Sequence, residues 1–238
     1  MITYRQLGRN GRLGNQLWQI AGTMAIAHAR DEPAGFPFWR YNAYFSVPEE
    51  LFPDLSTVDG EDLGLLYLQD LESISEVAAL VRRYFKPRPE VWASIAHRYQ
   101  DVLALPNRTA IHVRRGDYLL HGDLFTELPL TYYLEAMSLT QGPYLVFSDD
   151  IDWCRANFPR DCFFVEHNRD FEDLFLMAAC EEIITANSTF SWWGAWLANS
   201  RAIYPSEWGP AFGYADASVV VPAEAIMLDV STPRAVSS

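Results

Sequence analysis

The sequence predicts an α/β protein whose second part forms a parallel, doubly wound sheet. Between residues 110 and 205, short apolar runs alternate with segments of helical periodicity. This alternation is typical of parallel sheets, because parallel neighbours must be joined by a crossover, usually a helix. Residues 2–28 add a separate strand, glycine loop and helix. We therefore expect two lobes, residues 1–106 and 107–238, with the junction at residues 106–108.

The composition is typical of an acidic, folded protein. Half of the 238 residues are hydrophobic and the formal net charge is −13, which argues against a general nucleic-acid or membrane-surface binder. The three cysteines, Cys154, Cys162 and Cys180, lack metal-site spacing and are expected to be reduced, buried thiols. We expect neither a secretory leader nor a membrane span, because the first residues lack an apolar stretch after a basic start and no apolar run approaches ~18 residues. We expect a cytoplasmic protein that meets a membrane only by peripheral association.

The first strand is expected at residues 2–7, where apolar and polar side chains alternate weakly. Three glycines between residues 8 and 14 mark a loop, and apolar spacing then predicts a helix from Asn15 to His28. A strand, a glycine loop and a helix place backbone N–H groups and a positive dipole end near an anion. A tight turn without a ligand explains the same glycines, so the loop alone does not establish a phosphate site.

The middle of the first lobe gives the weakest pattern. The aromatic-rich stretch 36–45 predicts a buried strand or a loop that lines a cleft. Residues 73–84 and 89–105 have helical spacing, and Glu76 three residues after Ser73 predicts a capping box.

The second lobe alternates regularly. Its strands are expected at residues 110–113, 143–147, 163–165, 183–186 and 202–205. Its helices are expected at residues 131–139, 151–158, 170–180 and 192–198. We expect the tail after Thr232 to be frayed.

The strand at 110–113 runs directly into a charged motif, Ile111-His112-Val113-Arg114-Arg115-Gly116-Asp117. A guanidinium can offer two parallel N–H donors to two phosphate oxygens. In open α/β sheets, ligands settle outside the carboxyl ends of the strands, where these arginines fall. The motif therefore predicts a phosphate site, with Arg114 as its first candidate ligand.

A hydroxyl-rich turn, Asn187-Ser188-Thr189-Phe190-Ser191, follows the strand at 183–186 and opens the next helix. Serine and threonine at a helix start commonly cap the backbone. The same N–H groups and hydroxyls can hold a phosphate. We expect this turn to complete the site begun by the two arginines.

The carboxylates of Ser148-Asp149-Asp150 leave three interpretations open. Adjacent carboxylates can hold Mg²⁺ against a diphosphate, but no third ligand lies nearby in the sequence. One of them can cap the helix at 151–158. One can also accept hydrogen bonds from guanine, whose N1–H and 2-amino donors match the two carboxylate oxygens.

Four segments together resemble the α-1,2-fucosyltransferase family: Gly11-Arg-Leu-Gly-Asn-Gln-Leu, His112-Val-Arg-Arg-Gly-Asp-Tyr, Ser148-Asp-Asp and Asn187-Ser-Thr-Phe-Ser-Trp-Trp-Gly-Ala-Trp-Leu. The resemblance implies a GT-B architecture of two Rossmann-like lobes and GDP-β-L-fucose as donor. It also implies inversion at the anomeric carbon and no obligatory metal or other cofactor. The chain is short for the family, so we expect the first lobe to be reduced within residues 36–105.

The resemblance assigns the carboxyl-terminal lobe to the nucleotide sugar and the amino-terminal lobe to the glycan acceptor. Arg114 and Asp117 would be the catalytic residues, Arg114 on the β-phosphate and Asp117 ordering its loop. The residues expected to bind the donor are Gly11, Gly14, Asn15, His112, Arg114, Arg115, Asp149, Asp150, Asn187, Ser188, Thr189, Phe190 and Ser191.

The reaction expected from these features is fucose transfer to a galactose-terminated glycan, with O2 of galactose as the accepting hydroxyl. Negative charge builds on the departing phosphate, and fixed donors aimed at it are usually the largest catalytic term. The general base is not identified; Asp123 and Glu127 are candidates, and His121 is expected to be solvent-exposed. Two alternatives are transfer of another 6-deoxy sugar, such as L-rhamnose, and a catalytically silent nucleotide- or glycan-binding protein.

Overall fold

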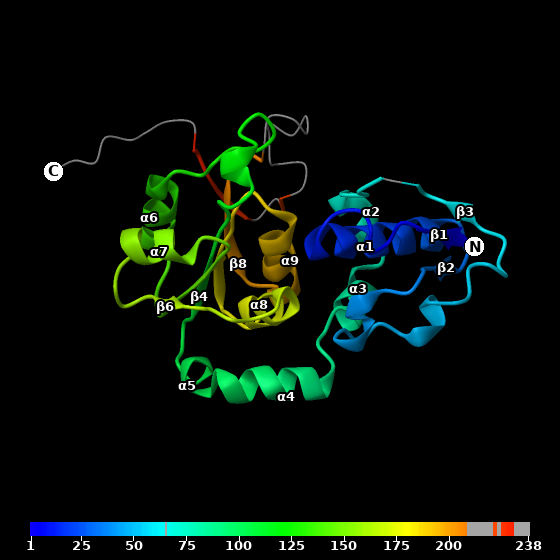
Figure 1. The fold of residues 1–238 in the computed structure, drawn as a ribbon, viewed down its shortest axis with the longest axis horizontal. Coiled ribbons are helices and arrows are strands. Elements are labelled where there is room, and N and C mark those ends of the chain that lie inside the picture. Colours follow the sequence, from blue (N-terminus) through cyan, green and yellow to red (C-terminus); the bar gives the residue numbers. More distant parts are fainter. Residues whose placement is uncertain (65, 209–220, 223–224, 231–238) are drawn as a thin grey trace. The chain divides into compact units, whose positions relative to one another are not determined.

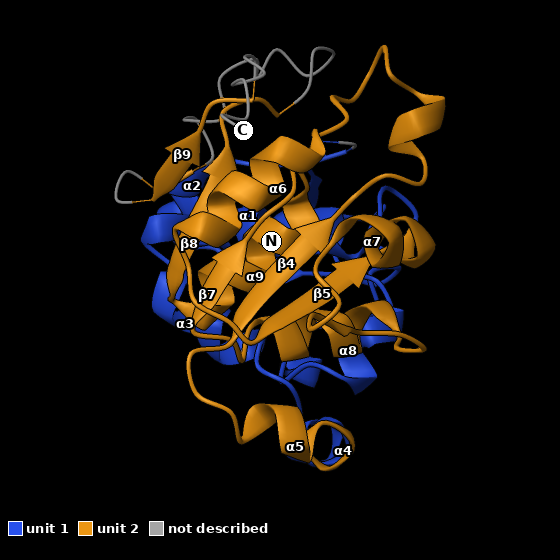
Figure 2. Ribbon diagram, turned by 90° about the vertical axis from the view of Figure 1, so that its left-hand side faces the viewer, with its two compact units in different colours: residues 1–95 blue, residues 96–238 orange. Residues whose placement is uncertain are grey.

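The computed structural model describes residues 1–64, 66–208, 221–222 and 225–230. The tail predicted to be frayed lies outside the described residues. The chain divides into two compact units, Met1–Ile95 and Ala96–Ser238 (Figure 2). The junction expected at residues 106–108 thus falls inside the second unit.

The first unit is a small α/β layer (Figure 1). Its parallel sheet has three strands in the order β2-β1-β3. These strands are β1 (Ile2–Thr3), β2 (Ala34–Gly35) and β3 (Glu61–Asp62). Helix α1 (Leu13–Ala29) packs on them and buries most of its residues. The predicted strand, loop and helix are present, although the strand is shorter than expected and the helix begins two residues before Asn15.

The rest of the first unit corrects two expectations. The aromatic stretch 36–45 forms no strand; it buries Phe36, Trp39 and Phe45 around the short 3-10 helix η1 (Arg40–Ala43). A second 3-10 helix, η2, covers Glu49–Leu51. Irregular backbone here lets adjacent aromatic side chains reach the same core, which strict strand alternation would prevent.

The expected long helices are each broken in two. Residues 73–84 belong to α2 (Leu71–Ser75) and α3 (Ala78–Tyr84), and the cap is Asp70, which accepts hydrogen bonds from the N–H groups of Glu72 and Ser73. The predicted capping box at Ser73 is therefore wrong, because the helix already begins at Leu71. Residues 89–105 divide at Tyr99 into α4 (Pro89–Arg98) and α5 (Gln100–Leu103).

The second unit is a six-stranded parallel sheet in the order β6-β5-β4-β7-β8-β9. Its strands are β4 (Thr109–Val113), β5 (Tyr144–Ser148), β6 (Phe163–Phe164), β7 (Glu182–Ile184), β8 (Arg201–Pro205) and β9 (Ile226–Leu228). Its helices are η3 (Tyr118–Leu120), α6 (Leu130–Ser138), α7 (Ile151–Asn157), α8 (Asp170–Met177) and α9 (Thr189–Ala198). All five predicted strands are present, and β9 is an addition that the sequence did not indicate.

The strand order reverses between β4 and β7. The chain proceeds from β4 outward through β5 and β6, then returns to pair β7 with the other side of β4. Helices α6 and α7 cover one face of the sheet, and α8 and α9 cover the other (Figure 1). Such a reversal is where doubly wound sheets bind ligands.

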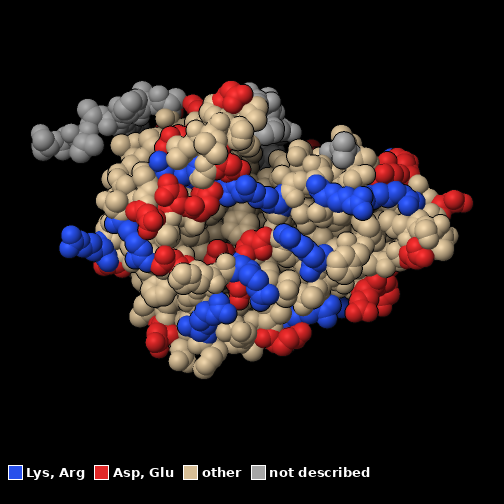
Figure 3. Space-filling model, viewed as in Figure 1, with Lys and Arg blue, Asp and Glu red and all other residues tan. Residues whose placement is uncertain are grey.

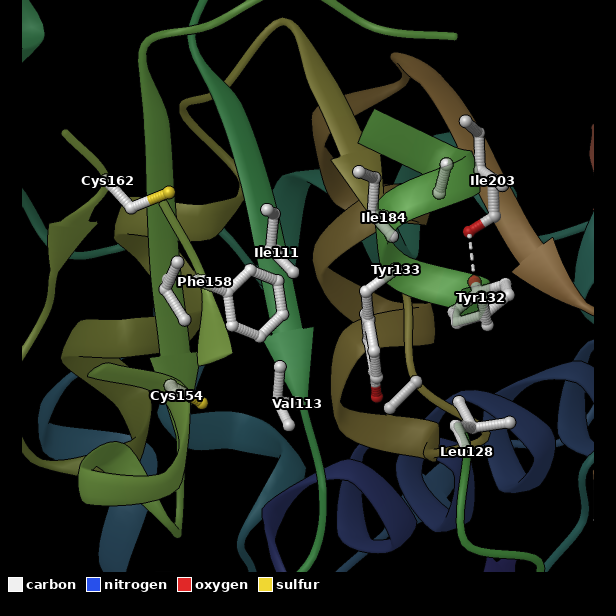
Figure 4. Close-up of a cluster of buried hydrophobic side chains, with 13 residues drawn as sticks. Ile111, Val113, Leu128, Tyr132, Tyr133, Cys154, Phe158, Cys162, Ile184 and Ile203 are labelled. Atoms are coloured by element: carbon white, nitrogen blue, oxygen red, sulfur yellow. Dashed lines mark hydrogen bonds between the residues drawn. The ribbon is translucent and has the colours of Figure 1, made fainter. Parts of the chain in front are cut away.

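The core of the second unit fixes this edge of the sheet. Ile111 and Val113 pack with Ile184 against Tyr132 and Tyr133 of α6 (Figure 4). The Tyr132 hydroxyl donates to the Thr185 carbonyl at 2.8 Å and lies 3.3 Å from the Ile203 carbonyl. Each of these large side chains is almost fully buried, so the strand ends beside them are rigidly supported.

The surface carries both signs of charge. Basic side chains lie interspersed with acidic ones over the face that Figure 3 presents. None of the helices described is long and apolar enough to cross a membrane.

Candidate functional site

The candidate site lies at the carboxyl ends of β4 and β7, within the second unit. These strands are parallel neighbours, with Ala110 opposite Ile183 and Ile111 opposite Ile184. The arginine motif follows β4, and the hydroxyl-rich turn follows β7. The two segments that the sequence predicted to meet are thus brought together at the strand-order reversal.

Carboxylates hold the Arg114 guanidinium from two sides. One terminal nitrogen donates to Asp117 Oδ1 at 2.5 Å, and the other lies 2.8 Å from Asp149 Oδ2. The guanidinium carbon is 5.6 Å from the centre of the Tyr118 ring. With 15% of its side chain exposed, Arg114 is fixed in direction and still reaches the surface.

Arg115 is held even more firmly. Its guanidinium stacks 4.1 Å from the Trp153 ring and forms ion pairs with Asp150, at 3.2 Å, and with Glu127. Its backbone N–H donates to Asp149 Oδ1 at 2.9 Å. Its next neighbour must be small, because a Cβ on Gly116 would lie 2.6 Å from Asp149 Oδ2.

The acidic pair therefore supports the arginines. Asp149 contacts both of them, and Asp150 caps α7 by accepting from the Trp153 N–H at 3.2 Å. Any contact with a guanine base would have to be made in addition to these bonds. Within the described ranges, no group of three or more His, Cys, Asp or Glu residues is placed to hold a metal ion.

Capping and turn bonds engage two hydroxyls of the α9 start. Ser188 is the N-cap, and its Oγ accepts from the Phe190 N–H at 3.3 Å. Ser191 is fully buried; its Oγ accepts from the Ala186 N–H at 3.2 Å and is within 3.3 Å of the Ala186 carbonyl. Both hydroxyls thus shape the turn, whatever else Ser188 contacts.

His112 and Asn187 are buried polar residues at this edge. The His112 ring centre lies 5.3 Å from that of Phe190, and burial lowers the pKa of His112 to about 4 although Asp149 opposes the shift. The imidazole is therefore neutral near pH 7. Over the described part of the chain, His112 Nδ1 and Asn187 Oδ1 find no hydrogen-bond partner.

Among the candidate bases, Glu127 is engaged in its ion pair with Arg115. Asp123 and His121 are exposed in the loop between η3 and α6, as expected for His121. The sequence reading missed Tyr118 and Trp153. Tyr118 directly follows Asp117, but its hydroxyl bonds to Asn187, 69 residues away, and nothing local indicates that partner.

The glycine loop of the first unit is held by its own helix. Gly11 has φ +75°, and its carbonyl accepts from the Gln16 side-chain amide at 2.9 Å. Gln19 donates in the same way to the Asn10 carbonyl at 2.9 Å. Gly14, expected in the loop, lies inside α1 and is buried, and Asn15 follows it in the helix.

Structural comparison identifies the fold. The crystal structure of NodZ α-1,6-fucosyltransferase soaked with GDP-fucose superposes with a TM-score of 0.55 over 82% of this chain and 91% of that chain, at 18% identity. The fold is thus that of the GT-B fucosyltransferases, with parallel sheets in both units.

Sequence comparison relates the second unit to a known family. Residues 94–208, just under half of the chain, match the model of Glycosyl transferase family 11, the α-1,2-fucosyltransferase family. It is 37% identical over 134 residues to an α-1,2-colitosyltransferase of Escherichia coli, covering 48% of this chain and 45% of that one. It is 31% identical over 111 residues to galactoside α-(1,2)-fucosyltransferase 1 of Saimiri sciureus, covering 40% and 30%. The chain spans less than half the length of these curated relatives.

Proposed function

We propose that this chain is an inverting glycosyltransferase that moves L-fucose, or a closely related deoxyhexose, from a GDP-sugar to a hydroxyl of a glycan. The observation that carries the proposal is the pair Arg114 and Arg115, held by carboxylates directly after β4, while α9 begins after the neighbouring parallel strand β7 at the strand-order reversal. The family match covers this same region. On this proposal the second unit binds the donor and the first unit serves the acceptor side.

On this proposal, anion binding depends more on where the arginine N–H donors point than on the net charge of the site. Four carboxylates, from Asp117, Glu127, Asp149 and Asp150, contact the two guanidiniums. The carboxylates outnumber the guanidiniums, so these contacts leave no net positive charge; what they supply is a fixed direction for the remaining N–H donors. Donors that are already oriented need no rearrangement as charge develops, which is why they stabilise a transition state well. The N-terminal end of α9 adds a favourable dipole.

In the proposed reaction, the bond between the anomeric carbon and the β-phosphate oxygen breaks as the acceptor oxygen attacks from the opposite side. The electron pair stays on the phosphate, where Arg114 donates hydrogen bonds to it. The acceptor hydroxyl loses its proton to a base. Asp123, which is exposed in the loop between η3 and α6, is the candidate for this role, and the role requires that the loop contacts the acceptor. The donor contacts expected of Gly11, Gly14 and Asn15 in the first unit stay part of the proposal.

The sugar transferred has two candidates with a specific basis. The family is that of α-1,2-fucosyltransferases, and a relative of 37% identity is named for colitose. Both sugars would leave the same GDP group, so the arginines do not distinguish them. Galactose O2 as the acceptor position follows the galactoside fucosyltransferase among the relatives.

Arg114→Ala is the direct test. We expect kcat/KM with GDP-fucose and a galactose-terminated acceptor to fall on the order of 10²–10³, the usual effect of removing one preorganised donor. Arg155→Ala is the control, because Arg155 also pairs with a carboxylate, that of Glu166, and stacks on an aromatic ring, that of Phe164, away from the motif. Undiminished turnover by Arg114→Ala would exclude the proposed role.

Nucleotide choice tests the donor separately. GDP should raise the melting temperature more than UDP or dTDP, because only a bound nucleotide stabilises the folded state by mass action. A preference for dTDP would favour transfer of a sugar such as L-rhamnose. GDP binding with neither transfer nor hydrolysis of GDP-fucose would identify a silent nucleotide-binding protein.

A further inference from the structure

The loop after the arginine motif is tied at two points to one residue, Asn187. At its beginning, the Tyr118 hydroxyl donates to the Asn187 carbonyl at 2.9 Å. Near its end, the Thr126 carbonyl accepts from the Asn187 side-chain amide at 2.8 Å. The same amide donates to the Trp208 carbonyl at 2.9 Å. Asn187 is 2% exposed; its bonds to Tyr118 and Trp208 are buried, and its bond to Thr126 is partly buried.

Tyr118 is in contact with both halves of the proposed phosphate site. Its ring stacks on Phe125 with centres 4.2 Å apart and planes 5° apart, and the Arg114 guanidinium carbon lies 5.6 Å from its centre. Its hydroxyl reaches the turn that opens α9, where Ser188 is a second hydrogen-bonding partner. Burial raises the pKa of Tyr118, so the hydroxyl remains a donor at every physiological pH.

We infer that Tyr118 is a positioning residue: its hydroxyl holds the arginine motif and the start of α9 in register, so that both address one diphosphate. The inference rests on the proposed function. It follows from the connectivity, since β4 and β7 are paired only up to Ile111 and Ile184. Beyond those residues the strand ladder no longer fixes the spacing. The bond from Tyr118 to Asn187 is a direct link between the two segments past the point where the ladder ends.

Tyr118→Phe removes one oxygen and leaves the ring contacts with Phe125 and Arg114 in place. The matched control is Tyr132→Phe, which removes another buried hydroxyl bonded to a carbonyl, that of Thr185, two residues before Asn187. Both variants should lower the melting temperature by similar amounts, because each loses one buried hydrogen bond. Only Tyr118→Phe should disturb the diphosphate site.

Two measurements separate positioning from stability. In the first, Kd for GDP and for guanosine is compared; Tyr118→Phe should weaken GDP binding about 3- to 10-fold, as expected for a buried hydrogen bond, and leave guanosine binding unchanged. Its kcat/KM should fall at least as much, whereas Tyr132→Phe should keep the wild-type constants. Equal weakening of GDP and guanosine, or no weakening, would overturn the positioning role.

The second measurement needs no nucleotide. Hydrogen exchange of residues 118–128 and 187–190 should accelerate in both segments in Tyr118→Phe, and in neither in Tyr132→Phe. Unchanged exchange would show that the hydroxyl does not link the segments. If the wild-type protein does not bind GDP, both the proposed function and the role of Tyr118 at a diphosphate are wrong. The exchange result still decides whether the Tyr118 hydroxyl links the two segments.

Discussion

The backbone at the start of α1 and the backbone at the start of α9 are held in place in different ways. Each helix follows a parallel strand and is expected to face an anion. The α1 start has no side-chain cap bond at Arg12, and side chains of α1 itself, Gln16 and Gln19, hold the carbonyls of its glycine loop. The α9 start has a serine cap and a short turn, and a tyrosine from the neighbouring strand's loop secures it.

The two helix starts differ in the sequence separation of the residues that hold them. The bonds of Gln16 and Gln19 to the loop span five and nine residues, so the α1 start is a local structure. The bond of Tyr118 to Asn187 spans 69 residues and exists only after β4 and β7 have paired. We expect the α1 loop to depend on its own amides and the α9 turn to depend on the assembled sheet.

The largest expected effect tests the local half of this comparison. Gln16 donates to the Gly11 carbonyl and accepts from the Trp39 indole N–H at 2.8 Å, and it is 2% exposed. Gln16→Ala leaves the buried Trp39 indole N–H unsatisfied, removes the partner of the Gly11 carbonyl and opens a cavity, so the free energy of unfolding should fall by about 4 kcal/mol. Urea denaturation measures the change.

The exposed Gln100 supplies the control, since Gln100→Ala removes a side chain of the same type from the surface of α5. We expect less than about 0.5 kcal/mol for it. A loss of similar size in Gln16→Ala would mean that the α1 loop is held by something other than its amides.

The same local-versus-distant distinction explains what the sequence could predict. Apolar runs set the strands of the second unit, and the fold class followed from their alternation with helices. Arg114 and the α9 turn could be placed together because parallel strands share a carboxyl edge. The contacts of Asp149 with Arg114 and of Asp150 with Arg115 could not be predicted, because they depend on the alignment of β5 beside β4. For residues 36–45 the sequence left a buried strand and a loop open, because burial in a small lobe does not require strand alternation; the backbone there is irregular.

A pH profile should separate the two helix starts, because only the α9 side holds a shifted histidine. The pKa of His112 is lowered by burial from 6.5 to about 4. Between these values this side chain binds more protons in the unfolded chain, so the contribution of His112 to stability falls by about 3 kcal/mol as the pH drops from 6.5 to 4. The amides of Gln16 and Gln19 do not titrate, so the α1 loop should be spared.

His112→Gln removes this contribution, so the variant should gain stability relative to the wild type as the pH falls through that window. Asp173, whose pKa is raised to about 7 by burial, contributes a slope of opposite sign, so the difference between variant and wild type is the quantity to measure. Urea midpoints at pH 7, 6 and 5 give this difference. Parallel profiles for the two proteins would show that His112 is not buried in neutral form.

The smallest expected effect compares a glycine in each helix. A Cβ on Gly22 of α1 would lie 2.5 Å from Leu68 Cβ and 3.1 Å from the Leu68 carbonyl oxygen. A Cβ on Gly194 of α9 would lie 2.5 Å from the sulfur of Met177. The first clash involves atoms close to the backbone, at a residue whose φ of +57° already restricts it. The second involves the end of a flexible thioether that can rotate away.

Gly22→Ala should therefore lower the free energy of unfolding by about 2 kcal/mol, as overpacked cores do. In Gly194→Ala the steric loss and the ~1 kcal/mol gain in helix propensity should nearly cancel. Both are read from urea denaturation under one set of conditions. If Gly194→Ala lowers the free energy of unfolding more than Gly22→Ala does, then α9 is packed at least as rigidly within its unit as α1 is within its own. The contrast between a helix start held by its own side chains and one held by a distant tyrosine would then have to be given up.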